Sequence, residues 1–299
     1  MSTMARKGRR PFTFGLFMIY LFVGLFAAVC LYPFLLVISG SFTSKSEATL
    51  HGYSLFPRSF TMAAYNTLFA NMRSIVNGYR VTIFVTIVGT ILSLLVNSMM
   101  GFVLSRKQLH FRRILNFFVL FTMLFSGGMV SWYIICGKLG MRDNIWALIL
   151  PMTVGPWYIF LFRNYFTSIP DSLYEIAKID GAGDIRIFFQ IYIHLATPVL
   201  ATVTLFTALG FWNDWWLGLM LIEKDNLWPL QMLMRTIISN IQFLQTMEAN
   251  AEVQKLMATI PSESVRMALV IITTGPIMFL YPFVQRFFVK GIMVGAVKG

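Results

Sequence analysis

Long apolar runs separated by short polar segments make up most of the chain. Several of these runs reach the roughly 20 residues that a helix needs to cross a hydrocarbon core about 30 Å thick. We predict six membrane-spanning helices, at about 12–38, 77–104, 114–136, 145–167, 197–222 and 266–288. The pattern favours helices over a barrel, so the predicted fold class is an all-α membrane protein.

Composition supports this interpretation. Of the 299 residues, 57% are hydrophobic and 12% are charged, and the mean hydropathy is +0.71. Soluble domains carry about 25% charged residues, so the chain is expected to be an integral membrane protein. Its net charge of +12 does not indicate nucleic-acid binding, because the basic residues flank apolar runs and form no stripe with interleaved aromatics.

The basic residues predict the orientation. Lys and Arg concentrate in cytoplasmic segments of membrane proteins. With six spans, four basic segments fall on one side, so both termini (1–11 and 289–299) are expected in the cytoplasm and the stretches 40–75 and 223–264 outside. These basic residues are Arg6, Lys7, Arg9 and Arg10; Arg106, Lys107, Arg112 and Arg113; Lys178 and Arg186; Arg286, Lys290 and Lys298. The first run exceeds the roughly 7–15 residues of a signal peptide core and is expected to be retained.

A polar stretch at 168–194 interrupts the apolar pattern and predicts a helix-turn-helix on the cytoplasmic side. Ser168 and Asp171 stand in a capping-box-like spacing with Pro170 between them, which indicates a helix start. Gly181 and Gly183 favour a sharp turn, after which Asp184 could cap a second helix.

Two further features belong to this helix-turn-helix. Glu175 and Lys178 are spaced as an i,i+3 ion pair. One face of the second helix is predicted to lie against the bundle, through Ile185, Phe188, Phe189 and Tyr192. An interfacial amphipathic loop without a partner is the alternative interpretation.

The pattern Glu175-x-Ala177-x-x-x-Gly181 resembles the EAA motif in permease subunits of bacterial ATP-binding cassette (ABC) importers. Its form "EIAKIDGAGD" is similar to the carbohydrate-uptake branch, which includes maltose and multiple-sugar permeases. Stretches at 126–135, 143–151, 212–216 and 228–238 and the C-terminal end resemble the group that includes the LplC and YtcP permeases. Ile176 replaces the usual second alanine, and His194 stands where proline is common.

This resemblance implies a type I ABC importer permease fold over 12–288, with a coupling helix that inserts into a partner ATPase. The residues implied in that contact are Glu175, Ala177, Asp180, Gly181 and Ala182. The implied partners are a second, homologous permease subunit, two ATPase subunits and an extracytoplasmic solute-binding protein. Lipid of the bacterial cytoplasmic membrane surrounds the chain, and the implied cargo is a sugar of the oligosaccharide class.

The chain itself is not predicted to be an enzyme. It lacks a P-loop, HExxH and GxSxG, so ATP and Mg are expected only at the partner ATPase, with no cofactor in this chain. Cys30 and Cys136 lie in apolar runs without metal-ligand spacing, so no metal site is predicted. An ion-coupled secondary transporter is the main alternative, although acidic residues are scarce in the predicted spans. A membrane scaffold or sensor is a third possibility.

The segment "FWNDWWLG" at 211–218 is the predicted substrate path. Trp212, Trp215 and Trp216 could stack on sugar rings, while Asn213 and Asp214 could bond sugar hydroxyls. A carboxylate at membrane depth is costly and marks a functional candidate. An interfacial aromatic belt is the alternative for the tryptophans.

Two other features extend this prediction. Gln231 and Arg235, on the second outer segment, could face a saccharide or the protein that delivers it. Gly127 and Gly128 are expected to permit either a close helix approach or a break in the third span.

Overall fold

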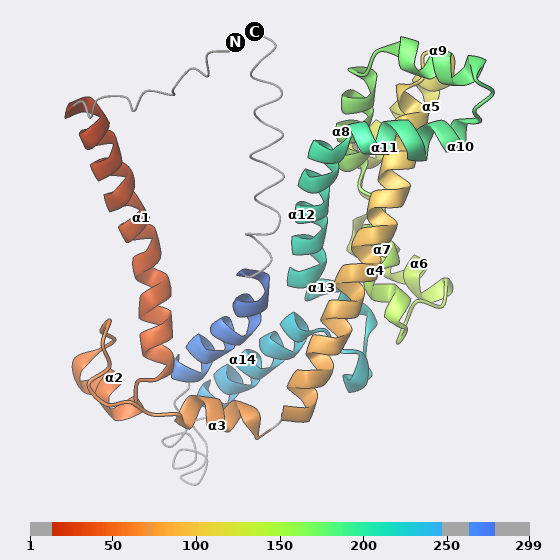
Figure 1. Cartoon of the computed structure of the whole chain (residues 1–299). Helices are drawn as coiled ribbons and strands as arrows, with labels where there is room; N and C mark the ends of the chain where they lie inside the picture. Colours follow the sequence, from red (N-terminus) through yellow and green to blue (C-terminus); the bar gives the residue numbers. More distant parts are fainter. Residues whose placement is uncertain (1–13, 71, 247–262, 279–299) are drawn as a thin grey trace. The chain divides into compact units, whose positions relative to one another are not determined.

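The computed structural model describes residues 14–70, 72–246 and 263–278, and within these ranges it contains helices and no strand (Figure 1). The predicted all-α class is confirmed. The chain divides into two compact units. The N-terminal unit comprises residues 1–68 and 248–271, and the main unit comprises 69–247 and 272–299. The predicted terminal segments 1–11 and 289–299 lie outside the described residues.

The N-terminal unit contains α1 (Phe14–Ser41), α2 (Lys45–His51) and α3 (Ala63–Phe69), the last of which ends in the main unit's first residue. Helix α1 matches the first predicted span and is exposed over most of its length within the chain. Beyond it, the carboxylate of Glu47 accepts hydrogen bonds from the backbone N–H groups of Arg58 and Ser59, each at 2.6 Å. These bonds close the segment after α1 into a compact loop.

The main unit is organised around one long helix, α4 (Met72–Ser105), which matches the second predicted span. Helices α8, α12 and α14 pack against it. The approach of α8 depends on Gly101, because a Cβ at that position would lie 2.5 Å from Cβ of Phe162. The other elements of the main unit are α5 (Arg112–Leu124), α6 (Gly128–Lys138), η1 (Ile145–Leu148), α7 (Leu150–Thr153), α8 (Pro156–Thr167), α9 (Asp171–Ile179), α10 (Asp184–Ile187), the π-helix η2 (Phe188–Tyr192), α11 (Ile193–Leu195), α12 (Thr197–Asn213), α13 (Trp216–Leu221), η3 (Asp225–Leu227) and α14 (Leu230–Thr246).

Three of the predicted spans are divided into shorter helices. Helices α5 and α6 meet at an angle of 114°, and the helical segments on the two sides of 154–155 meet at 46°. In the fifth predicted span, α12 ends at Asn213 and α13 begins at Trp216. The break between α5 and α6 falls at Gly127 and Gly128, one of the two roles expected for these glycines, and Gly128 has a φ of +81°.

The sixth span and the second outer segment are described in part. A helix covers 263–278, the first part of the sixth predicted span, while 279–288 lie outside the described residues. The outer segment predicted at 223–264 is largely helical where it is described, since α14 occupies 230–246. Two helices and three bent pairs are long and apolar enough to cross a membrane among the described residues, so the count of six spans stays a prediction.

A buried asparagine on α4 supports the break before α8. The side-chain amide of Asn97 donates to the carbonyl of Thr153 at 2.9 Å, and its oxygen accepts the backbone N–H of Gly155 at 2.9 Å. Pro156 cannot donate a backbone hydrogen bond, so helix α8 starts anew there. Unpaired backbone groups are costly inside a membrane bundle, and Asn97 satisfies two of them.

Candidate coupling surface and transport cavities

The helix-turn-helix predicted at 168–194 is present as α9 and α10, but its start differs from the prediction. The hydroxyl of Ser168 donates to the carbonyl of Tyr165 at 2.7 Å and thus closes the end of α8. Asp171 instead accepts a hydrogen bond from Nζ of Lys107 at 2.9 Å. The predicted capping box is therefore wrong, because both side chains bond to other elements. Helix α9 begins directly after Pro170 without a side-chain cap.

The end of α9 explains the small residues of the motif. Gly181 has a φ of +77°, a left-handed conformation that residues with a side chain resist. Its N–H donates to the carbonyl of Lys178 at 3.0 Å, and that of Ala182 donates to the carbonyl of Ala177 at 2.9 Å. These two bonds form a Schellman motif. Ala177 is buried and Ala182 half-buried, and both contact one hydrophobic cluster, so larger side chains would separate α9 from the bundle.

Asp184 joins the two helices and does not cap the second, which corrects another prediction. Its carboxylate accepts hydrogen bonds from the hydroxyl of Tyr174 at 2.6 Å and from Nζ of Lys178 at 2.9 Å. Lys178 therefore pairs with Asp184 and not with Glu175. The bond from Tyr174, followed by that from Lys178, lowers the pKa of Asp184 below its ordinary value of 3.8. We call α9, the turn and α10 together (171–187) the coupling hairpin.

The second helix packs with a register that the sequence pattern did not predict. Ile187, Phe188 and Tyr192 are buried, whereas Ile185 and Phe189 are exposed. The π-helix η2 contains Phe188, Phe189 and Tyr192 and widens one turn, so the regular helical periodicity assumed in the prediction does not hold there, while Ile185 lies before it in α10. The prediction that all four residues 185, 188, 189 and 192 face the bundle is therefore wrong for Ile185 and Phe189.

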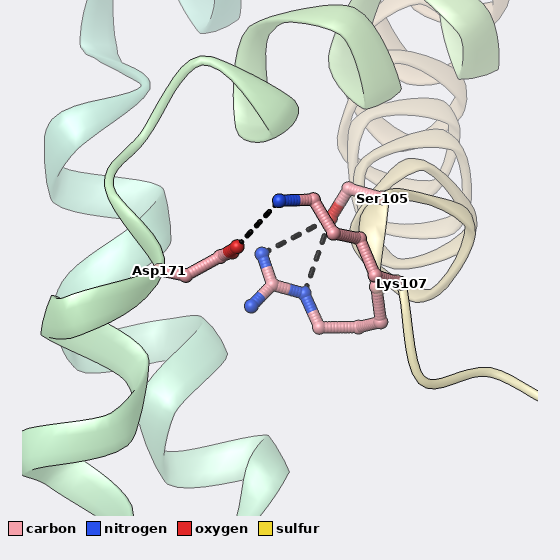
Figure 2. A network of polar contacts seen from close by, with 4 residues as sticks. Ser105, Lys107 and Asp171 are labelled. Carbon is pink, nitrogen blue, oxygen red and sulfur yellow. Dashed lines mark hydrogen bonds and ion pairs between the residues drawn. The ribbon is translucent and has the colours of Figure 1, made fainter.

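The end of α4 holds the coupling hairpin in place through Arg106. The guanidinium lies 5.0, 4.8 and 4.7 Å from the ring centroids of Phe102, Tyr174 and Tyr192, which belong to α4, α9 and η2. Its Nε and Nη2 donate to the hydroxyl of Ser105. Figure 2 shows this contact beside the ion pair of Lys107 with Asp171. From the sequence, Arg106 indicates only the orientation of the chain, because the three rings that it contacts lie far apart along the chain.

The exposed surface of the coupling hairpin includes three isoleucines and the acidic side chains of Glu175 and Asp180. Ile176, Ile179 and Ile185 are 57%, 86% and 69% exposed. Glu175 is exposed as well, and it forms no hydrogen bond or ion pair through its side chain within the described part of the chain. Asp180 and Gly181 lie at the exposed turn. Among the predicted coupling residues, Glu175, Asp180 and Gly181 are therefore available to a partner, whereas Ala177 and Ala182 pack against the bundle.

The residues of the predicted substrate path lie around the break between α12 and α13 and belong to different cavities. Asp214 and Trp216 line a cavity of about 690 Å³, the Asp214 cavity. The carboxylate of Asp214 also accepts the backbone N–H of Leu217 at 3.2 Å, which caps α13. The Trp216 ring lies 4.7 Å from that of Trp132. The full lining is Ser126, Gly127, Gly128, Met129, Ser131, Trp132, Ile135, Pro151, Met152, Asp214, Trp216 and Leu217.

Trp215 belongs to a second cavity of about 410 Å³, the Arg235 cavity, which it shares with α14. The Arg235 guanidinium lies 3.6 Å from the centroid of the Trp215 ring. Gln231 donates to the side-chain oxygen of Asn213 at 3.3 Å. The lining residues are Trp215, Gln231, Met234, Arg235, Ile238, Ser239 and Gln242.

Trp212 lines neither cavity. It is buried, and its indole N–H donates to the carbonyl of Thr273 at 3.1 Å. The three tryptophans of one short segment therefore lie in three different environments. Within the described ranges no group of three or more His, Cys, Asp or Glu side chains is placed to hold a metal ion.

A family model described as "Binding-protein-dependent transport system inner membrane component" matches residues 110–294, which include the coupling hairpin and the lining of both cavities. The chain belongs to this family. As a member of it, the chain is a membrane component of an ABC transporter, in agreement with the motif at Glu175 to Gly181. Nothing in these findings favours the ion-coupled alternative.

Relatives of this inner membrane component match it over nearly its whole length. Protein LplC of Bacillus subtilis is 38% identical, with 93% of each chain covered. The polygalacturonan/rhamnogalacturonan transport system permease protein YtcP of the same organism is 37% identical, with 94% of this chain and 97% of YtcP covered. The predicted resemblance to the LplC and YtcP group is confirmed.

A solved structure shows the same fold. It is the crystal structure of a bacterial ABC transporter involved in the import of the acidic polysaccharide alginate. One of its chains superimposes with a TM-score of 0.79 at 29% identity, covering 95% of this chain and 99% of that one. The predicted ABC importer permease fold is therefore confirmed.

Proposed function

We propose that the chain is a permease subunit of an importer that carries oligosaccharides into the cell. The observation that carries the proposal is the coupling hairpin, which is fixed to the bundle by buried residues and leaves the unpaired carboxylate of Glu175 and three isoleucines exposed. In water this exposed apolar face would be a liability. Such a surface is expected on a subunit that docks on a partner through this face.

The partner of this surface is an ATPase subunit that binds ATP and Mg. We expect two such subunits, a second homologous permease subunit and a solute-binding protein. ATP binding would move the ATPase subunits, and the coupling hairpin would pass that movement to α4 through Arg106 and Lys107. Coupling of this kind requires that the hairpin stays attached to the bundle in both states of the transporter.

The proposed coupling role implies an orientation of the chain in the membrane. The coupling hairpin and both termini would face the cytoplasm. The N–H of Leu230, the first residue of α14, donates to the hydroxyl of Thr82 at 2.8 Å. Thr82 and Ser105, the last residue of α4, are separated by 23 positions, about 35 Å along the helix axis. The Arg235 cavity would therefore open at the extracytoplasmic end.

The cargo is an oligosaccharide. The two cavities join polar side chains to aromatic ones, which suits sugar rings, and each lies in the size range of about 300–1,000 Å³ that is usual for small-molecule sites. YtcP is named for polygalacturonan and rhamnogalacturonan transport, and the superimposed transporter imports alginate. These names support a polysaccharide-derived cargo.

Reconstitution tests the proposal. The chain, its partner subunits and the binding protein are placed in nanodiscs, and ATP hydrolysis and sugar uptake are measured with a panel of oligosaccharides. We expect an oligosaccharide to stimulate hydrolysis and to be transported. Glu175→Ala should reduce both while the complex still assembles, and Glu223→Ala, an exposed glutamate far along the chain, is the matched control. Unchanged stimulation in Glu175→Ala would contradict the coupling role.

A further inference from the structure

The charged group of the Arg235 cavity has no counter-charge in the described chain. Among the residues that the structure describes, Arg235 is the only charged one that lines this cavity. Its guanidinium forms no hydrogen bond or ion pair within the described residues, although it lies 3.6 Å from the Trp215 ring centroid. Stacking uses the face of the guanidinium and leaves the N–H groups at its edge free to donate.

The surroundings of Arg235 suit an anion that also carries hydroxyl groups. Gln231, Ser239 and Gln242 offer neutral donors and acceptors. Gln231 is oriented by its bond to Asn213, whose own amide donates to the carbonyl of Leu209 at 2.9 Å. Trp215 restricts the Arg235 side chain, so less conformational entropy is lost when a ligand binds.

The two cavities differ in charge. Asp214 is the only charged residue of the described ranges that lines the Asp214 cavity, and an anionic ligand would be repelled there. In the Arg235 cavity the same ligand would meet a planar fork of donors that matches a carboxylate in a bidentate pair. The chain thus provides one cavity that suits an anionic saccharide and one that does not.

We propose that the Arg235 cavity binds the carboxylate of an acidic oligosaccharide, with Arg235 as the residue that selects uronate-containing over neutral sugars. This inference rests on the proposed function and names the substrate class that it leaves open. A lipid phosphate shares the anionic chemistry. The three neutral hydrogen-bonding side chains beside Arg235 favour a sugar, because its ring hydroxyls can use them and a phosphate cannot use all of them.

Direct binding to the assembled transporter tests the inference. Radiolabelled trigalacturonate and its carboxyl-reduced, neutral counterpart are dialysed to equilibrium against the transporter in phosphatidylcholine nanodiscs without binding protein. We expect the acidic trisaccharide to bind about 10- to 100-fold more tightly, the range for hydrogen bonds between charged groups. Arg235→Gln should abolish this preference, and Arg235→Lys should retain part of it. Arg80→Gln is the matched control, an exposed arginine outside both cavities.

The outcomes separate this inference from the proposed function. Equal binding of both trisaccharides, or an unchanged preference in Arg235→Gln, would overturn the uronate site while uptake of an oligosaccharide still supported the importer. Absence of uptake of every saccharide would overturn both. If phosphatidylglycerol in the nanodiscs prevents trigalacturonate binding to the wild type, the site takes lipid phosphate and the inference is wrong.

Discussion

Replacing Arg106 should loosen the coupling hairpin without unfolding the bundle. The guanidinium is half-buried between rings from α4, α9 and η2, at 4.7–5.0 Å from their centroids. A single cation–π contact contributes about 0.5–2 kcal/mol, depending on how far it is desolvated. Of the three rings only that of Tyr174 belongs to the hairpin, so we take the value for one desolvated contact, about 2 kcal/mol, which corresponds to roughly a 30-fold change in the docking equilibrium of the hairpin.

Amide hydrogen exchange measures that equilibrium. In Arg106→Gln, the amides of Ala182 and Ile187, which bond the carbonyls of Ala177 and Gly183, should exchange about 30-fold faster than in the wild type. Arg106→Lys keeps the charge but not the planar group and should give an intermediate rate. Transported sugar per ATP hydrolysed should fall in parallel, because a loosely held hairpin transmits less of the ATPase movement.

The control is Arg113→Gln, an exposed arginine in the same predicted cytoplasmic segment. It should leave both exchange and coupling unchanged. If exchange in Arg106→Gln stays within threefold of the wild type, Arg106 does not hold the hairpin, and the proposed route from the hairpin to α4 is wrong.

Four further predictions concern single sites. Gly181→Ala should destabilise the hairpin by about 1–2 kcal/mol, because the backbone at 181 is left-handed, and it should speed amide hydrogen exchange in 177–187. Gly183→Ala should leave the stability nearly unchanged, because Gly183 has a φ of −72°. Asn97→Leu should lower the melting temperature, with a loss of about 1–3 kcal/mol for each unpaired backbone group, while Ser98→Ala should change little. Because Tyr174 and Lys178 lower the pKa of Asp184, the stabilisation that they give is present above pH 3.8 and is lost as the pH falls through the lowered pKa. Amide hydrogen exchange of the hairpin, corrected for its intrinsic rate, should show this loss of stability at low pH. Asp184→Asn should remove the pH dependence. Asp214→Asn keeps an oxygen to cap α13, so it should reduce uptake without unfolding, and unchanged uptake would remove Asp214 from the substrate path.

Local backbone chemistry accounts for the features that sequence analysis predicted correctly. The turn at Gly181 was predictable because a left-handed residue after a helix is usually glycine. The long apolar runs at 14–41 and 72–105 could be recognised as candidate membrane spans from their length. The family resemblance predicts a coupling segment at 168–194, which composition alone would have left as an interfacial loop.

Competition between neighbouring elements explains the failures. Ser168 can cap α9 or bond back to α8, and the sequence does not show which bond forms. Regular helical periodicity does not hold over the π-helix at 188–192, where Phe188 packs against Phe102 and Phe166 while Phe189 is exposed. Asn97 gave a usable signal, because an amide in an apolar span must find a partner. Its partner, the backbone around 153–155, could not be inferred.

Photo-cross-linking tests whether the coupling hairpin docks on an ATPase subunit. In a background of Cys30→Ser and Cys136→Ala, benzophenone maleimide is attached to Ile179→Cys, the most exposed isoleucine of the hairpin, in the assembled and active transporter. The control site is Lys138→Cys at the exposed end of α6. We predict an adduct with the ATPase subunit from position 179 and none from position 138. An active transporter that gives no ATPase adduct from position 179, or that gives one from position 138, would show that the hairpin does not dock on the ATPase subunit in this way.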